Sequence, residues 1–502
     1  MLANATPTLM EPRRVTPQPH ASQSVVRELV LFVFAAAVVR ALVWWAMGRA
    51  IDSADAILYL ETAQHFYQGD FANFYTRIPV LYPALVAIAH VVIPDVEYAA
   101  RFVSLVASSL TVVPIYLLAR NMLGLHAARI AALAVVVAIW PADYASRETP
   151  EALACLLWFC GVYTLSNATN AKWTSALVPL GFFFALHLTR PEGTFILLAS
   201  IPLLFAYRWM SGNKSLAPTL VYAALAVVAL VGYSYLLKAV TGVSDVNSRV
   251  TSASAAAHFV LVSHAVPIGR AFVKLVTEVL PMMIGPYALL FAGVSLFRIA
   301  KRNLALEGLV LAFAALQVVL AALSSYPEPR YIMVTVLAAT IWAAHGMAIT
   351  SETLCARNAK RVVVALPVIG MLLIACFHAT IALGPGLLGR MPHEPREFRD
   401  AGRWMRDNLE PGLILARKPQ IGFYAGMPTT GPASNDTPET LVERAQTSSA
   451  RYVVIDERYT ANIAPGLAPL LDPVNAPAQL TLKQMIDPPY DGGRVAIYAV
   501  SP

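Results

Sequence analysis

Long apolar runs recur along most of the chain and indicate its fold class. Between Leu29 and Leu383 short polar turns separate these runs, and most approach the roughly 20 residues that an α-helix needs to cross a bilayer. A helix satisfies its backbone polar groups internally, as a lipid environment requires. The pattern predicts a polytopic α-helical membrane protein with about 11 transmembrane helices. The predicted spans lie near residues 29–47, 97–119, 127–142, 151–168, 173–189, 191–209, 217–239, 278–298, 304–323, 331–349 and 361–383.

The apolar stretch over residues 78–93 is too short to be one of these spans. It has about 16 residues, below the length that crosses a bilayer, and Pro79, Pro83 and Pro94 interrupt or flank it. We predict that it lies in the membrane interface, within a first outer loop over residues 49–96.

The pattern changes at residue 385. Residues 385–502 contain many prolines and no long apolar run. Their periodicity predicts a small α/β domain with helices over residues 396–409 and 438–446 and strands over 413–416, 451–455 and 495–500. Upstream, we divide the chain into a tail over residues 1–26, predicted to be disordered, and a transmembrane domain over residues 27–384.

Composition supports the membrane assignment. Of the 502 residues, 57% are hydrophobic and only 13% are charged, about half the roughly 25% that is usual in soluble domains. The net charge of +7 does not indicate a nucleic-acid partner, because no arginine-rich segment with interleaved aromatic residues is present. The four cysteines show no metal-ligand spacing, and the sequence requires no metal.

Basic residues concentrate on one side of the predicted membrane. With residues 78–93 in the interface, one set of turns holds most of them: Arg120, Arg129, Lys172, Arg208, Lys214, Arg298, Lys301, Arg302, Arg357, Lys360 and Arg361. Such an excess marks the cytoplasmic side. We therefore predict an inner-membrane protein with a cytoplasmic N-terminus and an extracytoplasmic C-terminal domain.

The opposite, outer turns combine acids with arginines. They contain Asp52, Asp55, Tyr59, Glu61 and Tyr82 in the first loop, then Asp143, Arg147, Glu148 and Glu151, then Arg190 and Glu192, then Asp245, Arg249, His258, His264, Arg270 and Lys274, and finally Glu328, Arg330 and Tyr331. Taken singly, Asp55 suits a helix N-cap and Arg330 a headgroup anchor. The alternation over the whole set favours a functional site instead.

This combination fits one chemistry in particular. Guanidinium and ammonium groups bind phosphate oxygens, and a carboxylate serves as general base toward a hydroxyl or amine. At a membrane rim, these groups favour transfer of a sugar from a polyprenyl-phosphate donor to an acceptor glycan, lipid or protein. Such a donor needs no nucleotide, and the chain has no Gly-rich phosphate loop.

Several motifs, in this order, resemble the GT-C glycosyltransferases, in particular the protein O-mannosyltransferase and aminoarabinose transferase group. The motifs run over residues 55–63, 82–83, 146–153, 189–193 and 330–331, and the resemblance extends over about residues 29–385. Parts of the C-terminal region, near residues 417–426 and 452–459, look like the terminal domain of some members.

The resemblance implies roles for these positions. The first-loop acid would be the catalytic base, which is Asp55, with Asp52 as the alternative; the acid of the second outer turn maps to Glu151, with Glu148 as a rival. Arg190 and Arg330 would face the donor phosphate. Substrate-binding candidates are Tyr59, Tyr82, Arg147, Glu148, Arg190, Glu192, Arg270, Lys274, Arg330 and Tyr331. Some members use a divalent metal and others do not, so the cofactor stays open.

Two other classes of function are compatible with the sequence. A transporter or flippase of a lipid-linked glycan would share the lipid partner, but its charges should lie near mid-span rather than at one rim. A scaffold for envelope assembly would need the outer loops without their chemistry. The sugar and the acceptor are not determined by the sequence.

Overall fold

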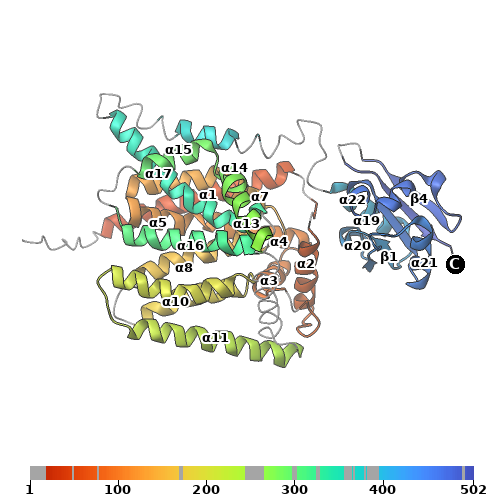
Figure 1. Cartoon of the computed structure of the whole chain (residues 1–502), viewed down its shortest axis with the longest axis horizontal. Coiled ribbons are helices and arrows are strands. Elements are labelled where there is room, and N and C mark those ends of the chain that lie inside the picture. The colour runs from red at the N-terminus through yellow and green to blue at the C-terminus, as the bar shows by residue number, and fades with distance from the viewer. Residues whose placement is uncertain are drawn as a thin grey trace, which may run out of the picture.

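The structure is a computed structural model. It describes residues 19–47, 50–51, 53–75, 78–168, 173–242, 265–296, 302–323, 328–355, 365, 368–377, 380, 395–488 and 492–501. A bundle of helices leads into a smaller α/β part, which lies at the end of the bundle near α2 (Figure 1).

The N-terminal half of the bundle contains both long and short helices. The helices are α1 (Pro19–Met47), α2 (Ala54–Tyr67), α3 (Leu81–His90), α4 (Val96–Leu110), α5 (Val112–Leu123), α6 (Leu125–Val137), α7 (Ile139–Ala145), α8 (Glu151–Asn167), α9 (Leu177–His187), α10 (Gly193–Met210) and α11 (Ala217–Thr241). The bundle continues with α13 (Ala265–Lys274), α14 (Leu280–Ile284), α15 (Pro286–Leu296), α16 (Leu304–Leu323), the 3₁₀ turn η3 (Pro329–Ile332) and α17 (Met333–Cys355).

In the described part of the chain, 6 helices are long and apolar enough to cross a membrane, or up to 8 if each bent pair counts as one span. These are Ser24–Met47, Val96–Leu123, Gly193–Met210, Ala217–Thr241, Leu304–Leu323 and Pro329–Leu354, with the bent pairs Leu125–Val137 plus Ile139–Ala145 and Pro267–Ile284 plus Pro286–Leu296. The chain is a multi-span membrane protein, but the predicted number of about 11 spans is not confirmed. The predicted spans at 151–168 and 173–189 form the shorter helices α8 and α9. Of residues 361–383, the structure describes the short apolar helix Val368–Phe377 and the single residues 365 and 380.

Proline and glycine explain where the two bent pairs break. The ring of Pro141 cannot follow an unbroken helix because it would meet the carbonyl of Val137, four residues earlier, and α6 ends at that residue. Between α14 and α15, Gly285 adopts a φ of +82° and Pro286 starts the next helix. The second pair bends by 99°.

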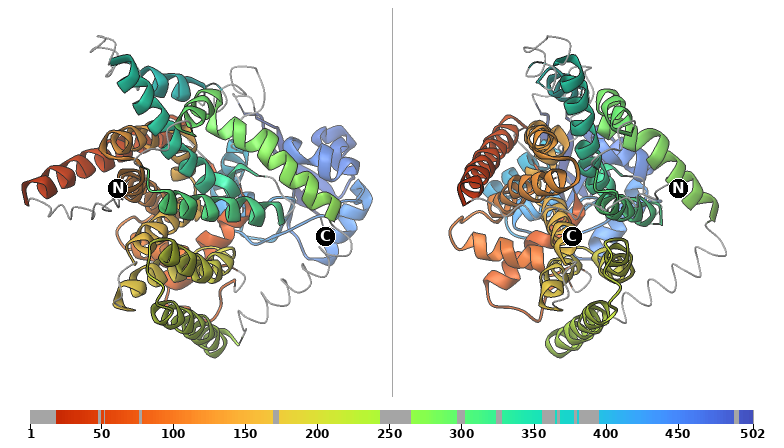
Figure 2. Two further views of the ribbon diagram at one scale, coloured as in Figure 1. Left: turned by 60° about the vertical axis from the view of Figure 1, so that its left-hand side comes forward. Right: turned by 90° about the vertical axis from the view of Figure 1, so that its left-hand side faces the viewer.

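Apolar side chains cover the outside of the bundle as well as its inside. Of the 18 residues that make α1 apolar enough to cross a membrane, only 11% are buried inside the protein. The corresponding share in α11 is 22%. Figure 2 shows both helices at the edges of the bundle. Large exposed residues such as Phe34, Trp45 and Leu236 lie on them, as expected for surfaces that contact lipid rather than water.

The C-terminal part is a five-stranded sheet between two layers of helices. Its elements are α19 (Arg396–Asn408), β1 (Ile414–Ala416), α20 (Pro419–Ala425), β2 (Thr429–Thr430), α21 (Pro438–Thr447), β3 (Tyr452–Asp456), α22 (Glu457–Ile463), β4 (Leu480–Ile486) and β5 (Val495–Val500). The strand order is β2-β1-β3-β5-β4, with β2, β1 and β3 parallel and β5 antiparallel to both neighbours.

Alternation along the strands gives this sheet a hydrophobic core on each face. Val453 and Ile455 face the cluster that contains Leu441 of α21, whereas Val454 faces the cluster that contains Phe398 of α19. The helices and strands predicted from sequence are present here, and the sequence did not reveal β2, β4, α20 or α22.

Candidate active site

The first outer loop presents Asp55 at the start of α2. Ser53 is the N-cap of this helix, and its hydroxyl accepts a hydrogen bond of 3.1 Å from the Asp55 N–H. The alternative role of Asp55 as the N-cap is therefore wrong. The Asp55 side chain is 56% exposed and does not cap the helix. Asp52, the rival base, lies outside the described residues.

The turn between α9 and α10 holds Arg190 rigidly between two carboxylates. Its Nη1 donates to Glu151 Oε1 at 2.6 Å, its Nη2 to Glu192 Oε1 at 2.8 Å and its Nε to Glu192 Oε2 at 3.3 Å. The pair with Glu192 is bidentate, which fixes the plane of the guanidinium. Glycine allows the tight turn, because a Cβ on Gly193 would lie 2.4 Å from the carbonyl oxygen of Leu186.

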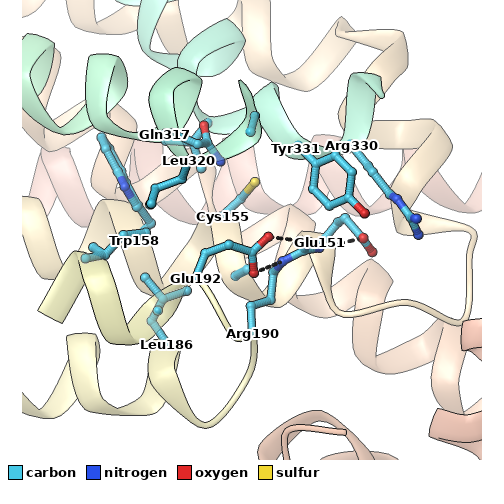
Figure 3. A pocket seen from close by; sticks show the side chains of 15 residues that line it. Glu151, Cys155, Trp158, Leu186, Arg190, Glu192, Gln317, Leu320, Arg330 and Tyr331 are labelled. Carbon is cyan, nitrogen blue, oxygen red and sulfur yellow. Dashed lines mark hydrogen bonds and ion pairs between the residues drawn. The ribbon is translucent and has the colours of Figure 1, made fainter. Parts of the chain in front are cut away.

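Arg330 reaches the same place from η3, the turn that leads into α17. Its Nη1 lies 3.7 Å from Asp55 Oδ2 and its Nε lies 2.6 Å from Glu328 Oε2. The guanidinium carbons of Arg190 and Arg330 lie 5.4 Å and 5.0 Å from the ring centroid of Tyr331. Tyr331 therefore stands between two cations, a favourable position for an aromatic ring (Figure 3).

These side chains line a small cavity of about 40 Å³. Glu151, Arg190, Glu192, Arg330 and Tyr331 form its polar end, and Trp158 and Leu186 are among its apolar walls (Figure 3). Glu151 is only 3% exposed, and its Oε2 has no hydrogen-bond partner among the described residues. An orphaned buried carboxylate oxygen is costly unless a ligand or water uses it.

The charges of this cluster stabilise one another. Burial opposes the charge of Arg190, but the carboxylates of Glu192 and Glu151 outweigh it and raise the pKa of the guanidinium well above its usual value. Burial also opposes ionisation of Glu192, yet the Arg190 guanidinium holds its pKa below the usual value. Burial raises the pKa of Tyr59, so its hydroxyl stays protonated.

A second, larger hollow is lined by Asp55 itself. It measures about 560 Å³ and is formed by α2 together with α20, β2 and the segment between them. Asp55, Glu61 and Gln64 of α2 face Phe423 and Met427 of the C-terminal part across it. Asp55 thus borders this hollow while its carboxylate contacts Arg330.

The remaining candidate residues are placed around this centre rather than in it. The ring of Tyr59 contacts Tyr82 edge-on, with centroids 5.6 Å apart, and Tyr82 is fully buried. Arg147 pairs with Asp143 at 3.1 Å, and Glu148 pairs with Arg101.

Arg270 and Lys274 do not join this cluster. Both are exposed on α13, and neither lines the cavity of about 40 Å³. Asp245, Arg249, His258 and His264 lie outside the described residues. Among the described residues, no three His, Cys, Asp or Glu side chains are grouped as metal ligands would be.

Sequence reasoning missed a buried polar face on α4. Glu97, Arg101, Ser104 and Ser108 recur at helical spacing inside a predicted span, and each is at most 7% exposed. They hold the second outer turn: Ser104 donates to the carbonyl of Thr149 at 3.2 Å, and Ser108 to that of Pro141 at 3.1 Å. The spacing i, i+4, i+7, i+11 in an apolar helix was the available signal.

The chain resembles known membrane glycosyltransferases in both sequence and structure. Residues 77–237 match the family model described as dolichyl-phosphate-mannose-protein mannosyltransferase. ArnT from Cupriavidus metallidurans bound to undecaprenyl phosphate has a TM-score of 0.61 and 16% identity, over 93% of this chain and 97% of that one.

A second solved structure has the same fold. The archaeal oligosaccharyltransferase AglB from Archaeoglobus fulgidus, in complex with an inhibitory peptide and a dolichol-phosphate, has a TM-score of 0.61 and 14% identity, over 90% of this chain and 72% of that one. A search of curated proteins found no match. The resemblance to the GT-C superfamily of glycosyltransferases, predicted from the sequence, is confirmed by the family match and the shared fold.

Proposed function

We propose that this chain transfers a sugar from a polyprenyl-phosphate donor to an acceptor on the outer face of the inner membrane. One observation carries the proposal: Asp55 from the first outer loop and Arg330 from the turn before α17 meet at 3.7 Å, next to Arg190. The solved structures with undecaprenyl phosphate and with a dolichol-phosphate support the donor class. The family match to a dolichyl-phosphate-mannose-protein mannosyltransferase supports sugar transfer.

The reaction we propose is a single displacement with inversion. Asp55 accepts the proton of the acceptor hydroxyl or amine, whose oxygen or nitrogen then forms a bond to the anomeric carbon of the sugar. The bond from that carbon to the phosphate oxygen breaks, and its electron pair leaves with the polyprenyl phosphate. Arg330 stabilises the charge that develops on the leaving phosphate.

The two arginines differ in how freely they can bind this phosphate. Arg190 engages two carboxylates through three of its five N–H groups, so it keeps donors for a ligand but cannot move. Arg330 has a long contact with Asp55 that a phosphate oxygen would replace. Binding of the donor would thereby release Asp55 to act as base. In this proposal Arg270 and Lys274 of α13 attract the negatively charged donor phosphate.

The two hollows near Asp55 suit two substrates. The small cavity with the arginines suits the donor phosphate, and the hollow of about 560 Å³ between α2 and α20 suits an acceptor. We therefore place the C-terminal domain, residues 385–502, on the outer face and the tail of residues 1–26 in the cytoplasm.

Loss of a single carboxylate tests the proposal. Mass spectrometry of envelope glycolipids and glycoproteins should reveal a product in cells with the wild-type chain and none with Asp55→Asn, at equal expression. Asp70, a partly buried acid of the same loop that contacts His65 and nearby N–H groups, provides the matched control, and Asp70→Asn should keep the product. Near-normal product with Asp55→Asn would refute the assignment of the base.

A second assay separates an enzyme from a transporter. Purified protein in detergent, supplied with the lipid extract of the same cells and the acceptor identified above, should still form product because no membrane sides exist there. A transporter would form none.

A further inference from the structure

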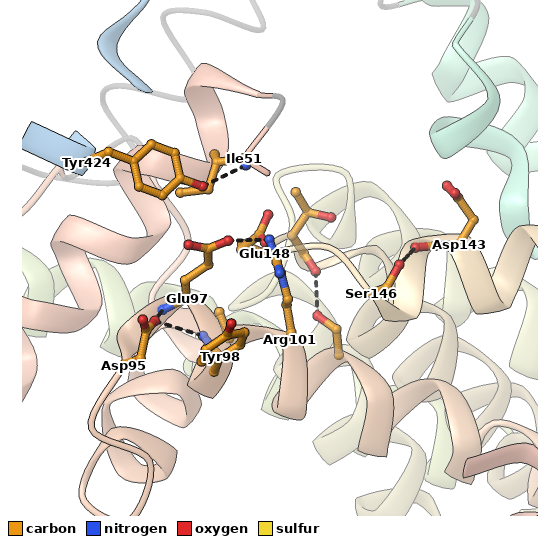
Figure 4. Close-up of polar contacts among 12 residues, drawn as sticks. Ile51, Asp95, Glu97, Tyr98, Arg101, Asp143, Ser146, Glu148 and Tyr424 are labelled. Atoms are coloured by element: carbon orange, nitrogen blue, oxygen red, sulfur yellow. Dashed lines mark hydrogen bonds and ion pairs between the residues drawn. The ribbon is translucent and has the colours of Figure 1, made fainter. Parts of the chain in front are cut away.

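A buried group of polar side chains lies between the C-terminal part and two outer segments of the bundle (Figure 4). These segments are the first outer loop, which carries Asp55, and the second outer turn, which carries Glu151. Tyr424 of α20 is only 7% exposed and packs into the same hydrophobic cluster as the bundle helices. Its hydroxyl accepts a hydrogen bond of 3.0 Å from the N–H of Ile51 and lies beside the Glu97 carboxylate. This one hydroxyl therefore contacts two parts of the chain that are far from α20 in sequence.

From Glu97 the network continues to the second outer turn. Arg101 pairs with Glu97 on one side and with Glu148 on the other, and these side chains are 3–9% exposed. Glu148 lies three residues before Glu151, the carboxylate that holds Arg190. A change at Tyr424 would thus reach the arginine cluster through ion pairs that water does not screen.

The hydrogen bond between Tyr424 and Ile51 leads to the proposed base. Ile51 is fully buried and lies four residues before Asp55, at the entry to α2. Phe423, the neighbour of Tyr424, lines the hollow that also contains Asp55. Helix α20 therefore has one side chain in the network and one in the hollow.

The position of Tyr424 is set by close packing inside the C-terminal part. A Cβ on Gly402 of α19 would lie 2.5 Å from the Cβ of Tyr424 and 2.6 Å from the carbonyl oxygen of Ile421. Only glycine lets α19 approach α20 this closely. The helix that carries Tyr424 is thus supported rigidly from behind.

We propose that Tyr424 is a positioning residue, through which the C-terminal domain holds the first and second outer turns in the geometry that transfer requires. The inference rests on the proposed function and gives the C-terminal domain a role in the chemical step, beyond binding an acceptor. Loss of the hydroxyl leaves the buried Ile51 N–H unpaired and removes a polar neighbour of Glu97, so the turns shift to recover partners.

Tyr424→Phe tests the proposal, with Tyr498→Phe as the matched control. Tyr498 is also a buried tyrosine of the C-terminal part, but its hydroxyl donates to Leu470 within that part. In Tyr424→Phe, kcat should fall about tenfold, while the donor KM stays within about twofold because Arg190 and Arg330 remain. The control should keep kcat within about twofold of wild type, and equal losses in both variants would overturn the proposal.

Hydrogen exchange provides a readout that does not depend on any activity. Amides of residues 50–60 should exchange about tenfold faster in Tyr424→Phe than in wild type or the control. Unchanged exchange would overturn the proposal, and so would faster exchange with an unchanged kcat. If the wild-type chain transfers no sugar, the proposed function fails, while exchange at residues 50–60 still decides whether Tyr424 holds the loop.

Discussion

Arg190 is a side chain whose role depends on shape as well as charge. Its planar fork meets Glu192 with two parallel hydrogen bonds and reaches Glu151 with a third, a pattern that the single ammonium group of lysine cannot reproduce. We predict that Arg190→Lys lowers the transfer rate by about 10²-fold and destabilises the fold by about 2 kcal/mol. Rate assays in detergent and thermal unfolding measure the two effects.

Arg129→Lys is the matched control for this substitution. Arg129 also forms two hydrogen bonds to one glutamate, Glu28, but its side chain is 47% exposed at the junction of α5 and α6. Exposed pairs contribute little, so this variant should keep the rate and lose well under about 1 kcal/mol. Equal effects of the two substitutions would show that Arg190 has no special role.

Glu192 should make the site sensitive to acid. Its pKa is lowered in the folded protein, so its ionised form stabilises the fold above the unfolded-state pKa, and this contribution disappears as the pH falls through the folded-state pKa. The stability difference between wild type and Glu192→Gln should therefore be constant near neutral pH and shrink below the usual glutamate pKa of 4.5. Thermal unfolding over a pH series measures it, and a constant difference down to pH 3 would contradict the prediction.

Among the elements, the contact between the end of α9 and the start of α10 determines where Arg190 lies. Gly193→Ala would drive a Cβ to 2.4 Å from the backbone of Leu186, so the helices must separate and the turn must move. We predict a loss of about 1–3 kcal/mol together with most of the activity. In Gly181→Ala, a control on α9 whose new Cβ meets nothing within 4 Å, unfolding should change by less than about 1 kcal/mol. Thermal unfolding and rate assays compare the two.

The same contact shows what the sequence could and could not predict. Apolar runs and turn residues were enough for the bundle and the α/β region, and the acids and arginines of the outer turns identified Asp55, Arg190 and Arg330 as candidates. They could not reveal that Glu148 turns away from Arg190 toward Arg101, because side-chain pairing between helices depends on how the helices pack. The 7-residue strand β4 was missed because a β-bulge between Leu482 and Gln484 breaks the alternation of its side chains.

Helix length explains the disagreement over spans. The predicted span near 151–168 is the 17-residue helix α8, just shorter than Gly193–Met210, which has 18 residues and is long enough to cross. Twelve residues of α8 are buried within the bundle. Burial does not decide whether a helix crosses, because Pro329–Leu354 is 67% buried over its most apolar 18 residues and is still long and apolar enough to do so.

At the scale of the whole molecule, the two ends of the bundle differ in charge. The turn after α5 and the segment before α16 meet, since the Asn303 N–H donates to the Met122 carbonyl at 3.3 Å, and both carry basic residues. Asp55 and Arg330 meet in the other set of turns, beside the C-terminal part. Because the two charged groups touch, the first loop and the turn before α17 must share one side of the membrane.

Cysteine labelling can establish which side that is. In a background with the four native cysteines replaced, we predict that Ala72→Cys and Thr447→Cys, exposed in the first loop and in the C-terminal part, react with a membrane-impermeant maleimide in intact cells. Ser211→Cys, exposed in the basic turn between α10 and α11, should react only after the membrane is opened. Labelling of Ser211→Cys alone in intact cells would show the opposite topology. The site would then bind its donor on the cytoplasmic side. Labelling of Ala72→Cys without Thr447→Cys would separate α2 from α20 and remove both the acceptor hollow and the role of Tyr424, since each requires the two helices to lie together on one side.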